Sequence, residues 1–333
     1  MLVTGGAGFI GSHLVDALLE RPDARVTVID RLSTGGSRMN LAQHDEDPRF
    51  AFVRADVNEE HVVDELVEAA DLVVHAAAES HVDRSIDDPR PFAVTNVLGT
   101  QIVLEAVRRH GRRMLMISTD EVYGPGDPAG GLFAEDAPVA PHSPYAASKA
   151  AADLLVRSYV HTFGLPAVIT RCSNNYGPYQ FPEKLVPLMI TNAVEGRRLP
   201  VFGDGRQVRD WIHVEDHCAG VLAALERGRA GEVYNFGARA ERANLDIVSR
   251  IVVLTGVAPG LVEHVADRPA HDRRYAMDAA KAERELGWRP ARSFEQGLAD
   301  TVRWYVEHEQ WWRAVKNGSY RDFYRTWYEE RGS

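Results

Sequence analysis

The sequence is poor in cysteine and has no long apolar run. Its 333 residues include two cysteines, Cys172 and Cys218, whose separation fits neither a metal-binding nor a redox motif. A disulfide framework is therefore not expected. No apolar stretch approaches the ~18 residues of a membrane span, and the N-terminus shows neither a basic segment nor a cleavage site. These absences predict a cytoplasmic protein.

Positive charge, and lysine above all, is also scarce. The chain has 38 lysines and arginines against 48 aspartates and glutamates, a net charge of −10, and no basic block. A nucleic-acid or anionic-membrane partner is therefore not expected. Four of the 38 basic residues are lysines, which leaves 34 arginines. Because surface positions tolerate arginine in place of lysine, each retained lysine marks a position where a compact, titratable ammonium could be needed.

The first half of the chain alternates short β-branched runs with longer segments of helical periodicity. Strands are predicted at 2–4, 25–30, 50–54, 71–76, 113–118 and 167–171, and helices at 10–20, 59–69, 92–110 and 144–163. This alternation predicts an α/β fold with a doubly wound parallel Rossmann sheet. Proline, glycine and aromatic residues become denser later. We predict a first domain over 1–171, a smaller irregular domain over 172–333, and a segment near 208–237 that returns to the first domain.

A glycine-rich segment, VTGGAGFIGSH, follows the first predicted strand. Gly5, Gly8 and Gly11 satisfy G-x-x-G-x-x-G, and the overlapping G-x-G-x-x-G pattern is also present. Such glycines let the backbone approach a pyrophosphate that lies on a helix N-terminus. The strand before the motif and the amphipathic helix after it are the context that the motif requires. The segment predicts dinucleotide binding.

Asp30 stands at the end of the second predicted strand, 19 residues after Gly11. A carboxylate there accepts hydrogen bonds from the adenosine ribose, and its charge repels a 2′-phosphate, so NAD is predicted rather than NADP. Arg31 could hold such a phosphate, but we interpret it as a solvated residue.

Two further pairs of residues predict acid–base chemistry. Asp120 and Glu121 follow the apolar run 113–117 in the segment STDEVYG, and adjacent like charges cost energy unless one is protonated or both are used. Tyr145 and Lys149 open a predicted helix at positions i and i+4, so they project from one face. An ammonium beside a phenol, together with the positive nicotinamide of NAD⁺, is expected to lower the pKa of the tyrosine and make it a usable base.

These motifs, with HAAAESHVDRSI, NVLGT, RCSNNYGPYQFPEKLVP, GDGRQVRDWIHVEDH and DRPAHDRRYAMD, resemble the extended short-chain dehydrogenase/reductase superfamily, and in detail its nucleotide-sugar 4,6-dehydratases. The resemblance runs nearly end to end. It implies an NAD-dependent lyase that converts dTDP-glucose to the 4-keto-6-deoxy sugar, and a homodimer. It also implies that Thr119 helps to bind the 4-oxygen of the sugar. Asp120 and Glu121 are then the acid and base of dehydration, while Tyr145 and Lys149 serve the oxidation.

The resemblance further implies sets of ligand-binding residues and no metal site. The expected cofactor contacts are Gly5, Gly8, Phe9, Ile10, Gly11, Asp30, Asp56, Val57, Ala76, Ala78, Thr95, Tyr145, Lys149 and Asn175. The expected substrate contacts are Ser80, Thr119, Asn174, Lys184, Leu185, Arg209, Asn244, Arg268 and His271. The chain departs from the family pattern at Ala238 and Ala240, close to Asn244.

Three alternatives remain at this point. An epimerase or decarboxylase of another nucleotide sugar is the nearest, although such enzymes typically lack the full Thr-Asp-Glu run. A non-catalytic sensor of NAD or of a nucleotide sugar belongs to a different class, and the complete set of acid–base residues argues against it. In HVEDH, His213 and His217 have zinc-like spacing, but the glutamate is third rather than second, so we interpret the histidines as structural.

Overall fold

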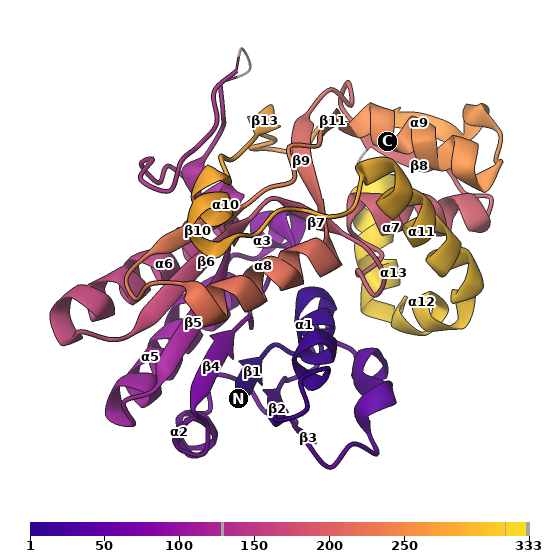
Figure 1. Ribbon diagram of the computed structural model, residues 1–333. Helices are drawn as coiled ribbons and strands as arrows, with labels where there is room; N and C mark the ends of the chain where they lie inside the picture. The colour runs from indigo at the N-terminus through magenta and orange to yellow at the C-terminus, as the bar shows by residue number, and fades with distance from the viewer. Residues whose placement is uncertain (128–129, 317, 331–333) are drawn as a thin grey trace.

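A computed structural model describes residues 1–127, 130–316 and 318–330 (Figure 1). Its centre is a seven-stranded sheet in the order β10-β6-β5-β4-β1-β2-β3, and every neighbouring pair is parallel. The strands are β1 (Leu2–Thr4), β2 (Val26–Ile29), β3 (Phe50–Val53), β4 (Leu72–His75), β5 (Arg113–Thr119), β6 (Ala167–Cys172) and β10 (Val233–Phe236). The predicted α/β fold with a doubly wound parallel sheet is confirmed.

Helices cover both faces of this sheet because alternate strand residues point to opposite sides. Val3, Val74 and Leu115 pack with α1 (Phe9–Leu19) and α8 (Val214–Arg227) in one core. Leu2 and Val73, their strand neighbours, pack with α2 (Glu60–Glu68), α5 (Gly99–Arg109) and α6 (Pro144–Phe163) in a second core. Uninterrupted apolar strands are therefore buried on both faces, as parallel sheets require.

The helix predicted over 92–110 is divided in the structure. It begins as α4 (Arg90–Phe92), continues as the π-helical turn η2 (Ala93–Leu98) and ends as α5. Isolated π-helical turns are frequent at functional sites. Periodicity over 92–110 indicated a helix but gave no sign of the extra residue in this turn.

The later part of the chain forms a third core beside the large sheet. Two small sheets contribute, one built from β7 (Asn174–Tyr176), β9 (Val208–His213), β11 (Glu241–Ala243) and β13 (Arg274–Tyr275), the other from β8 (Leu199–Phe202) and β12 (Val262–Val265). The helices are α7 (Leu185–Val194), α9 (Asn244–Thr255), α11 (Phe294–Glu307), α12 (Glu309–Val315) and α13 (Gly318–Tyr324). In Figure 1, α9 in orange and α11, α12 and α13 in yellow group around α7.

Chain connectivity crosses between these two parts. β10 pairs with β6 in the large sheet, and α10 (Ala280–Leu286) packs against α8, whereas β9 belongs to the small sheet. The division at residue 171 with a returning segment near 208–237 stays a prediction. Both cysteines are buried and free. Within the described ranges, no helix combines the length and the apolar character that crossing a bilayer requires.

Candidate active site

A cleft opens at the carboxyl ends of the large sheet, where the strand order reverses between β1 and β4. Open α/β sheets bind their ligands at this position. The cleft brings together every residue predicted for catalysis or cofactor contact, which are Gly5, Gly8, Phe9, Ile10, Gly11, Asp30, Asp56, Val57, Ala76, Ala78, Thr95, Thr119, Asp120, Glu121, Tyr145, Lys149 and Asn175.

The glycine-rich loop leaves no room for side chains at two of its positions. Gly5 has a φ of +69°, and a Cβ there would lie 2.6 Å from the backbone of Ala77. A Cβ at Gly11 would lie 2.2 Å from the carbonyl oxygen of Gly5. Gly8 precedes α1, and no side chain caps the first backbone N–H groups of that helix. These groups remain available to an anion such as a pyrophosphate, which fits a dinucleotide.

Asp30 is held by the loop that it faces. Its carboxylate accepts hydrogen bonds from the backbone N–H of Ala7 (3.0 Å) and of Leu32 (2.8 Å). Arg31, interpreted above as solvated, instead donates to Asp56 (2.7 Å) and to Glu79 (2.5 Å). That interpretation is wrong because both carboxylates come from other strand ends, which the local sequence does not reveal.

A second feature that fits a dinucleotide lies on the π-helical turn. The hydroxyl of Thr95 is buried and has no hydrogen-bond partner among the residues that the structure describes. The side chain of its neighbour Asn96 is fully hydrogen-bonded. The side-chain oxygen accepts from the Glu79 N–H, and the side-chain nitrogen donates to the Glu79 carbonyl and, over 2.8 Å, to Ser148 Oγ. An unpaired buried hydroxyl is costly unless a ligand pairs with it. Thr95 thus marks a point where a bound ligand would complete the structure.

The acid pair occupies the short 3₁₀ helix η3 (Asp120–Tyr123), directly after β5. Thr119 caps it: the Thr119 hydroxyl accepts from the Glu121 N–H (3.3 Å) and donates to Asp120 Oδ1 (3.2 Å). Asp120 is 3% exposed, and its Oδ2 is buried without a partner. Asp120 lines the cleft, and one of its carboxyl oxygens has no hydrogen-bond partner among the described residues.

The surroundings of these two carboxyls differ. Burial, followed by the charge of Glu121, raises the pKa of Asp120 to about 8. Burial also raises the pKa of Glu121, but the positive charges of Arg268, Lys184 and Arg209 oppose it. Asp120 is therefore the protonated carboxyl near neutral pH, whereas three positive charges oppose the upward shift of the Glu121 pKa. Two adjacent carboxyls with different environments can act as acid and base.

Tyr145 and Lys149 lie on the first turns of α6, as predicted, but their electrostatics differ from the prediction. Burial, then the charge of Glu121, raises the pKa of Tyr145 well above its ordinary value. The Lys149 ammonium donates to the carbonyl oxygen of Ile117 over 2.7 Å. Burial lowers the pKa of Lys149, which Asp153, one turn further along α6, opposes. The expected lowering of the tyrosine pKa is thus not produced by the protein alone.

The predicted substrate residues fall into two groups. Ser80, Thr119, Asn174 and Lys184 line the cleft, and the Lys184 ammonium donates to the Ser80 carbonyl over 2.6 Å. The others lie beyond its lining residues, namely Leu185 at the start of α7, Arg209 on β9, Asn244 at the start of α9, and Arg268 and His271 on the segment after β12.

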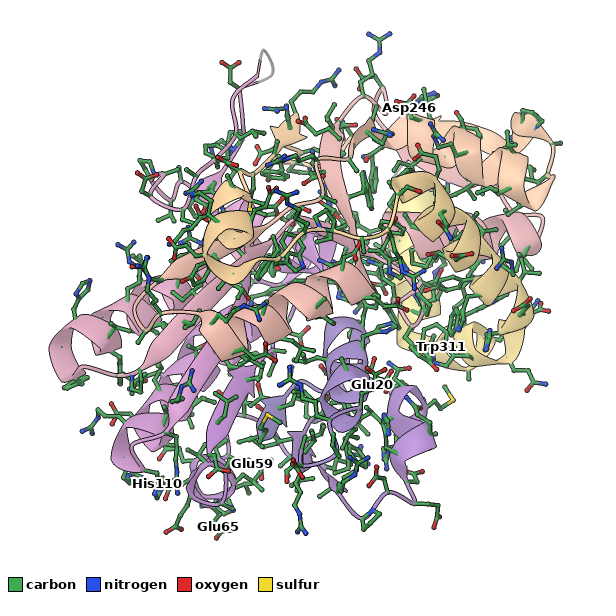
Figure 2. The ribbon with its side chains drawn as sticks, in the orientation of Figure 1. Glu20, Glu59, Glu65, His110, Asp246 and Trp311 are labelled. Carbon is green, nitrogen blue, oxygen red and sulfur yellow. The ribbon has the colours of Figure 1, made fainter. Side chains whose placement is uncertain are left out.

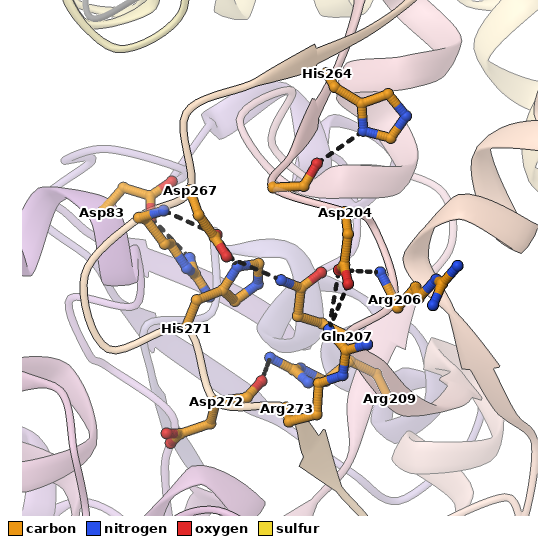
Figure 3. A network of polar contacts seen from close by, with 12 residues as sticks. Asp83, Asp204, Arg206, Gln207, Arg209, His264, Asp267, His271, Asp272 and Arg273 are labelled. Carbon is orange, nitrogen blue, oxygen red and sulfur yellow. Dashed lines mark hydrogen bonds and ion pairs between the residues drawn. The ribbon is translucent and has the colours of Figure 1, made fainter.

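Figure 3 shows part of this outer group, including Arg209 and His271, with the polar contacts around it. Arg268 donates to Asp83 (2.7 Å), and Arg209 donates to the Asp272 carbonyl (2.9 Å) while its guanidinium lies over the ring of Tyr275. His271 contacts Asp267 over 2.6 Å. Burial, then the charge of Arg268, lowers the pKa of His271 to about 4. The two arginines are therefore the cations of this group.

Several cleft residues were missed by sequence reasoning. They are Glu79 and His81 in the segment ESHVDR, Cys172 at the end of β6 and Ser173 after it, and Gln180 and Phe181 before α7. All six lie within or beside segments that the resemblance had already marked, which is the signal that could have found them. His81 is 6% exposed, and among the described residues neither ring nitrogen has a hydrogen-bond partner, although Nε2 lies 3.9 Å from the Glu183 carboxylate.

The HVEDH histidines have separate roles. His213 precedes α8, where its Nδ1 accepts from the backbone N–H of Glu215, and His217 contacts the side-chain oxygen of Asn175 over 3.0 Å. Because Asn175 lines the cleft, His217 holds the side chain of a cleft residue in place through this contact.

Comparison with known proteins agrees with this geometry. The family model described as GDP-mannose 4,6 dehydratase matches residues 2–301. A dTDP-glucose 4,6-dehydratase from Actinoplanes sp. is 50% identical over 94% of this chain and 99% of its own. The structure of DesIV, a dTDP-glucose 4,6-dehydratase from Streptomyces venezuelae with NAD and TYD bound, has a TM-score of 0.92 and 49% identity, covering 95% of this chain and 99% of that one.

A solved structure of an epimerase is also similar, at lower identity. UDP-glucuronic acid 4-epimerase from Bacillus cereus, in complex with UDP-glucuronic acid and NAD, has a TM-score of 0.87 and 32% identity over 92% of this chain and 98% of that one. The fold is thus shared with epimerases, while the higher identity is with dehydratases. The chain belongs to the dTDP-glucose 4,6-dehydratase family of the extended short-chain dehydrogenase/reductase superfamily.

Proposed function

We propose that this protein is an NAD-dependent lyase that converts dTDP-glucose to dTDP-4-keto-6-deoxy-glucose. The observation on which this rests is the acid pair: a buried, protonated Asp120 with one free oxygen, beside a Glu121 surrounded by three cations. Elimination of water from a sugar needs both a proton donor and a proton acceptor on adjacent carbons. The relatives named above support dTDP-glucose as the substrate.

NAD fits the residues of the cofactor half. The glycine loop has no space for a side chain at Gly5 or Gly11, the start of α1 is uncapped, and Thr95 offers an unpaired hydroxyl. Asp30 would accept the ribose hydroxyls and disfavour a 2′-phosphate. When bound, NAD supplies hydride acceptance from C4 of the sugar and hydride return to C6.

The chain's own residues then manage the protons. Tyr145 takes the proton of the 4-hydroxyl, and Lys149, whose ammonium donates to the Ile117 carbonyl, is the cation one turn further along α6. The resulting ketone acidifies the C5 hydrogen, which Glu121 removes. Asp120 gives its proton to the C6 hydroxyl as it leaves as water, and C5 is reprotonated at the end. Thr119 orients the Asp120 carboxyl through one hydrogen bond and fixes the backbone of Glu121 through another.

Charge on the substrate is met by the two arginines of the outer group together with Lys184 of the cleft. Arg209, Arg268 and Lys184 are nearly or partly buried around Glu121, and a diphosphate is the dianionic group that such cations suit. Leu185 and Asn244 are proposed as further contacts to the nucleotide, since each opens a helix beside this group.

A direct assay tests the proposal. The purified protein is incubated with dTDP-glucose, and the product is examined for loss of water and for the enone chromophore that a 4-keto-6-deoxy sugar gives in alkali. A product of unchanged mass would favour an epimerase instead. Retention of the sugar without turnover would favour a sensor.

A homodimer and a cytoplasmic location belong to the same proposal. Val94, Leu98 and Leu154 are between 45% and 51% exposed on η2 and α6, which lie against each other. An apolar surface on adjoining helices supports self-association. Light scattering of the purified protein tests it: a Leu154→Glu variant should be monomeric where the parent is dimeric.

A further inference from the structure

A chain of hydrogen bonds links the C-terminal helices to the glycine-rich loop. The indole N–H of Trp311, on α12, donates to Asn40 Oδ1 over 2.8 Å. Asn40 Nδ2 in turn donates to the carbonyl oxygen of Ala7 over 2.9 Å, and the N–H of Ala7 donates to Asp30 over 3.0 Å. Trp311 and Asn40 are 271 residues apart in the sequence.

Asn40 is the centre of this chain. It lies on η1 (Arg38–His44), is 0% exposed, and has its side-chain oxygen and nitrogen engaged in opposite directions. A buried amide that loses one hydrogen-bond partner keeps its desolvation penalty without a compensating hydrogen bond. Its orientation is therefore coupled to the presence of the Trp311 N–H, and it holds the Ala7 carbonyl together with the backbone N–H of Ser37, which donates to the same oxygen over 3.0 Å.

Trp311 is itself fixed by aromatic packing. Its ring lies 5.2 Å from that of Trp304 and 5.6 Å from that of Tyr179. Tyr179 also lies 5.7 Å from His13 on α1. Figure 2 shows Trp311 on the side of the C-terminal helices that faces the N-terminal part of the fold. Hydrogen bonding and ring packing thus join the two parts of the chain at one place.

None of the described residues after Lys184 lines the cleft, so α12 does not contact a cofactor there. We propose that Trp311 and Asn40 are positioning residues for cofactor retention: they hold the Ala7 peptide, and through it Asp30, in the arrangement that binds NAD. The inference rests on the proposed NAD site. It explains how a segment distant from the chemistry helps to keep the cofactor bound through a cycle that consumes none.

The test compares Trp311→Phe with two controls. The variant keeps a ring in the aromatic cluster but removes the N–H donor. Trp304→Phe changes the same cluster outside the hydrogen-bonded chain, and Gln43→Ala changes η1 at an exposed side chain that binds Asp16 and the Asn40 backbone. Each protein is passed through gel filtration, and the NAD that it retains is measured after denaturation, together with the dissociation constant for added NAD.

We expect Trp311→Phe to weaken NAD binding about five- to twentyfold and to lose most of its NAD on the column, with Asn40→Ala at least as severe. Turnover should return to near the parent kcat when NAD is in excess. Both controls should retain NAD as the parent does. Equal retention by Trp311→Phe and the parent, or equal loss by Trp311→Phe and Trp304→Phe, would overturn the inference while leaving the proposed function intact. A parent that binds no NAD would instead overturn the proposed function, and this inference with it.

Discussion

Glu121 stands next to Asp120, and its charge adds to burial in raising the pKa of Asp120 to about 8. The proton needed for elimination is therefore present at neutral pH and is lost as the pH rises through that value. We predict that the rate of water elimination falls above about pH 8, while oxidation at C4, followed by nicotinamide absorbance in single turnovers, does not fall with it. A parallel loss of both steps would show that a group other than Asp120 limits the reaction.

The same shift predicts an effect on stability. The pKa of Asp120 is raised above the ~3.9 of an unfolded aspartate, so the folded state keeps a proton that the unfolded state releases. Its contribution to stability therefore decreases as the pH rises from about 4 to about 8. Asp120→Asn has no such proton and should be more stable than the parent by an amount that grows over this window to about 2–5 kcal/mol.

Denaturant unfolding at several pH values measures this difference. Asp23→Asn, at an exposed loop position, is the control and should show no comparable pH-dependent gain. A difference between Asp120→Asn and the parent that is constant from about pH 4 to about pH 8 would contradict the assigned protonation of Asp120.

The substitution Lys149→Arg tests a retained lysine in a chain whose basic residues are mostly arginines. Its ammonium is 5% exposed and fits the Ile117 carbonyl, where the larger, delocalised guanidinium cannot take the same place. Lys149→Arg should lower the rate of C4 oxidation by roughly 10²-fold or more and change its pH profile. Lys281→Arg is the matched control, since Lys281 pairs with Glu232 on the far side of the large sheet. An unchanged pH profile for Lys149→Arg would remove Lys149 from the reaction.

Cofactor choice gives a further prediction. Because Arg31 is paired with Asp56 and Glu79 rather than free, the purified protein should contain NAD(H) and bind NADP weakly. Arg31→Ala should leave this preference unchanged, whereas Asp30→Ala should reduce it. Recovery of mostly NADP(H) from the denatured parent would refute the role given to Asp30.

Local sequence predicted most of the large sheet. Periodicity placed β1 and α6 at their observed bounds and the other strands of the first half to within two residues. Each of these segments has the regular apolar spacing of a strand or helix that packs in the core. Motif spacing likewise predicted that the glycine loop, Asp30 and the acid pair lie at one cleft, because parallel strands place their carboxyl ends at one edge of the sheet.

Relationships between distant segments were beyond that reasoning. The pairing of Arg31 depends on two other strand ends, and the raised pKa of Tyr145 depends on burial beside Glu121. The bond between Trp311 and Asn40 joins opposite ends of the chain. Such contacts arise from how packed elements meet, and a pattern in one segment contains no information about the partner.

The most direct test of the central claim follows the hydrogen at C4 of the substrate. With dTDP-glucose deuterated at C4 and the reaction run in ordinary water, the product methyl group should contain the deuterium, and C5 should contain a solvent proton. Asp120→Asn and Glu121→Gln should each still oxidise C4 but lose elimination by roughly 10²–10⁴-fold. Deuterium returned to C4 or released to solvent, or elimination at the parent rate in both variants, would contradict the role assigned to the acid pair.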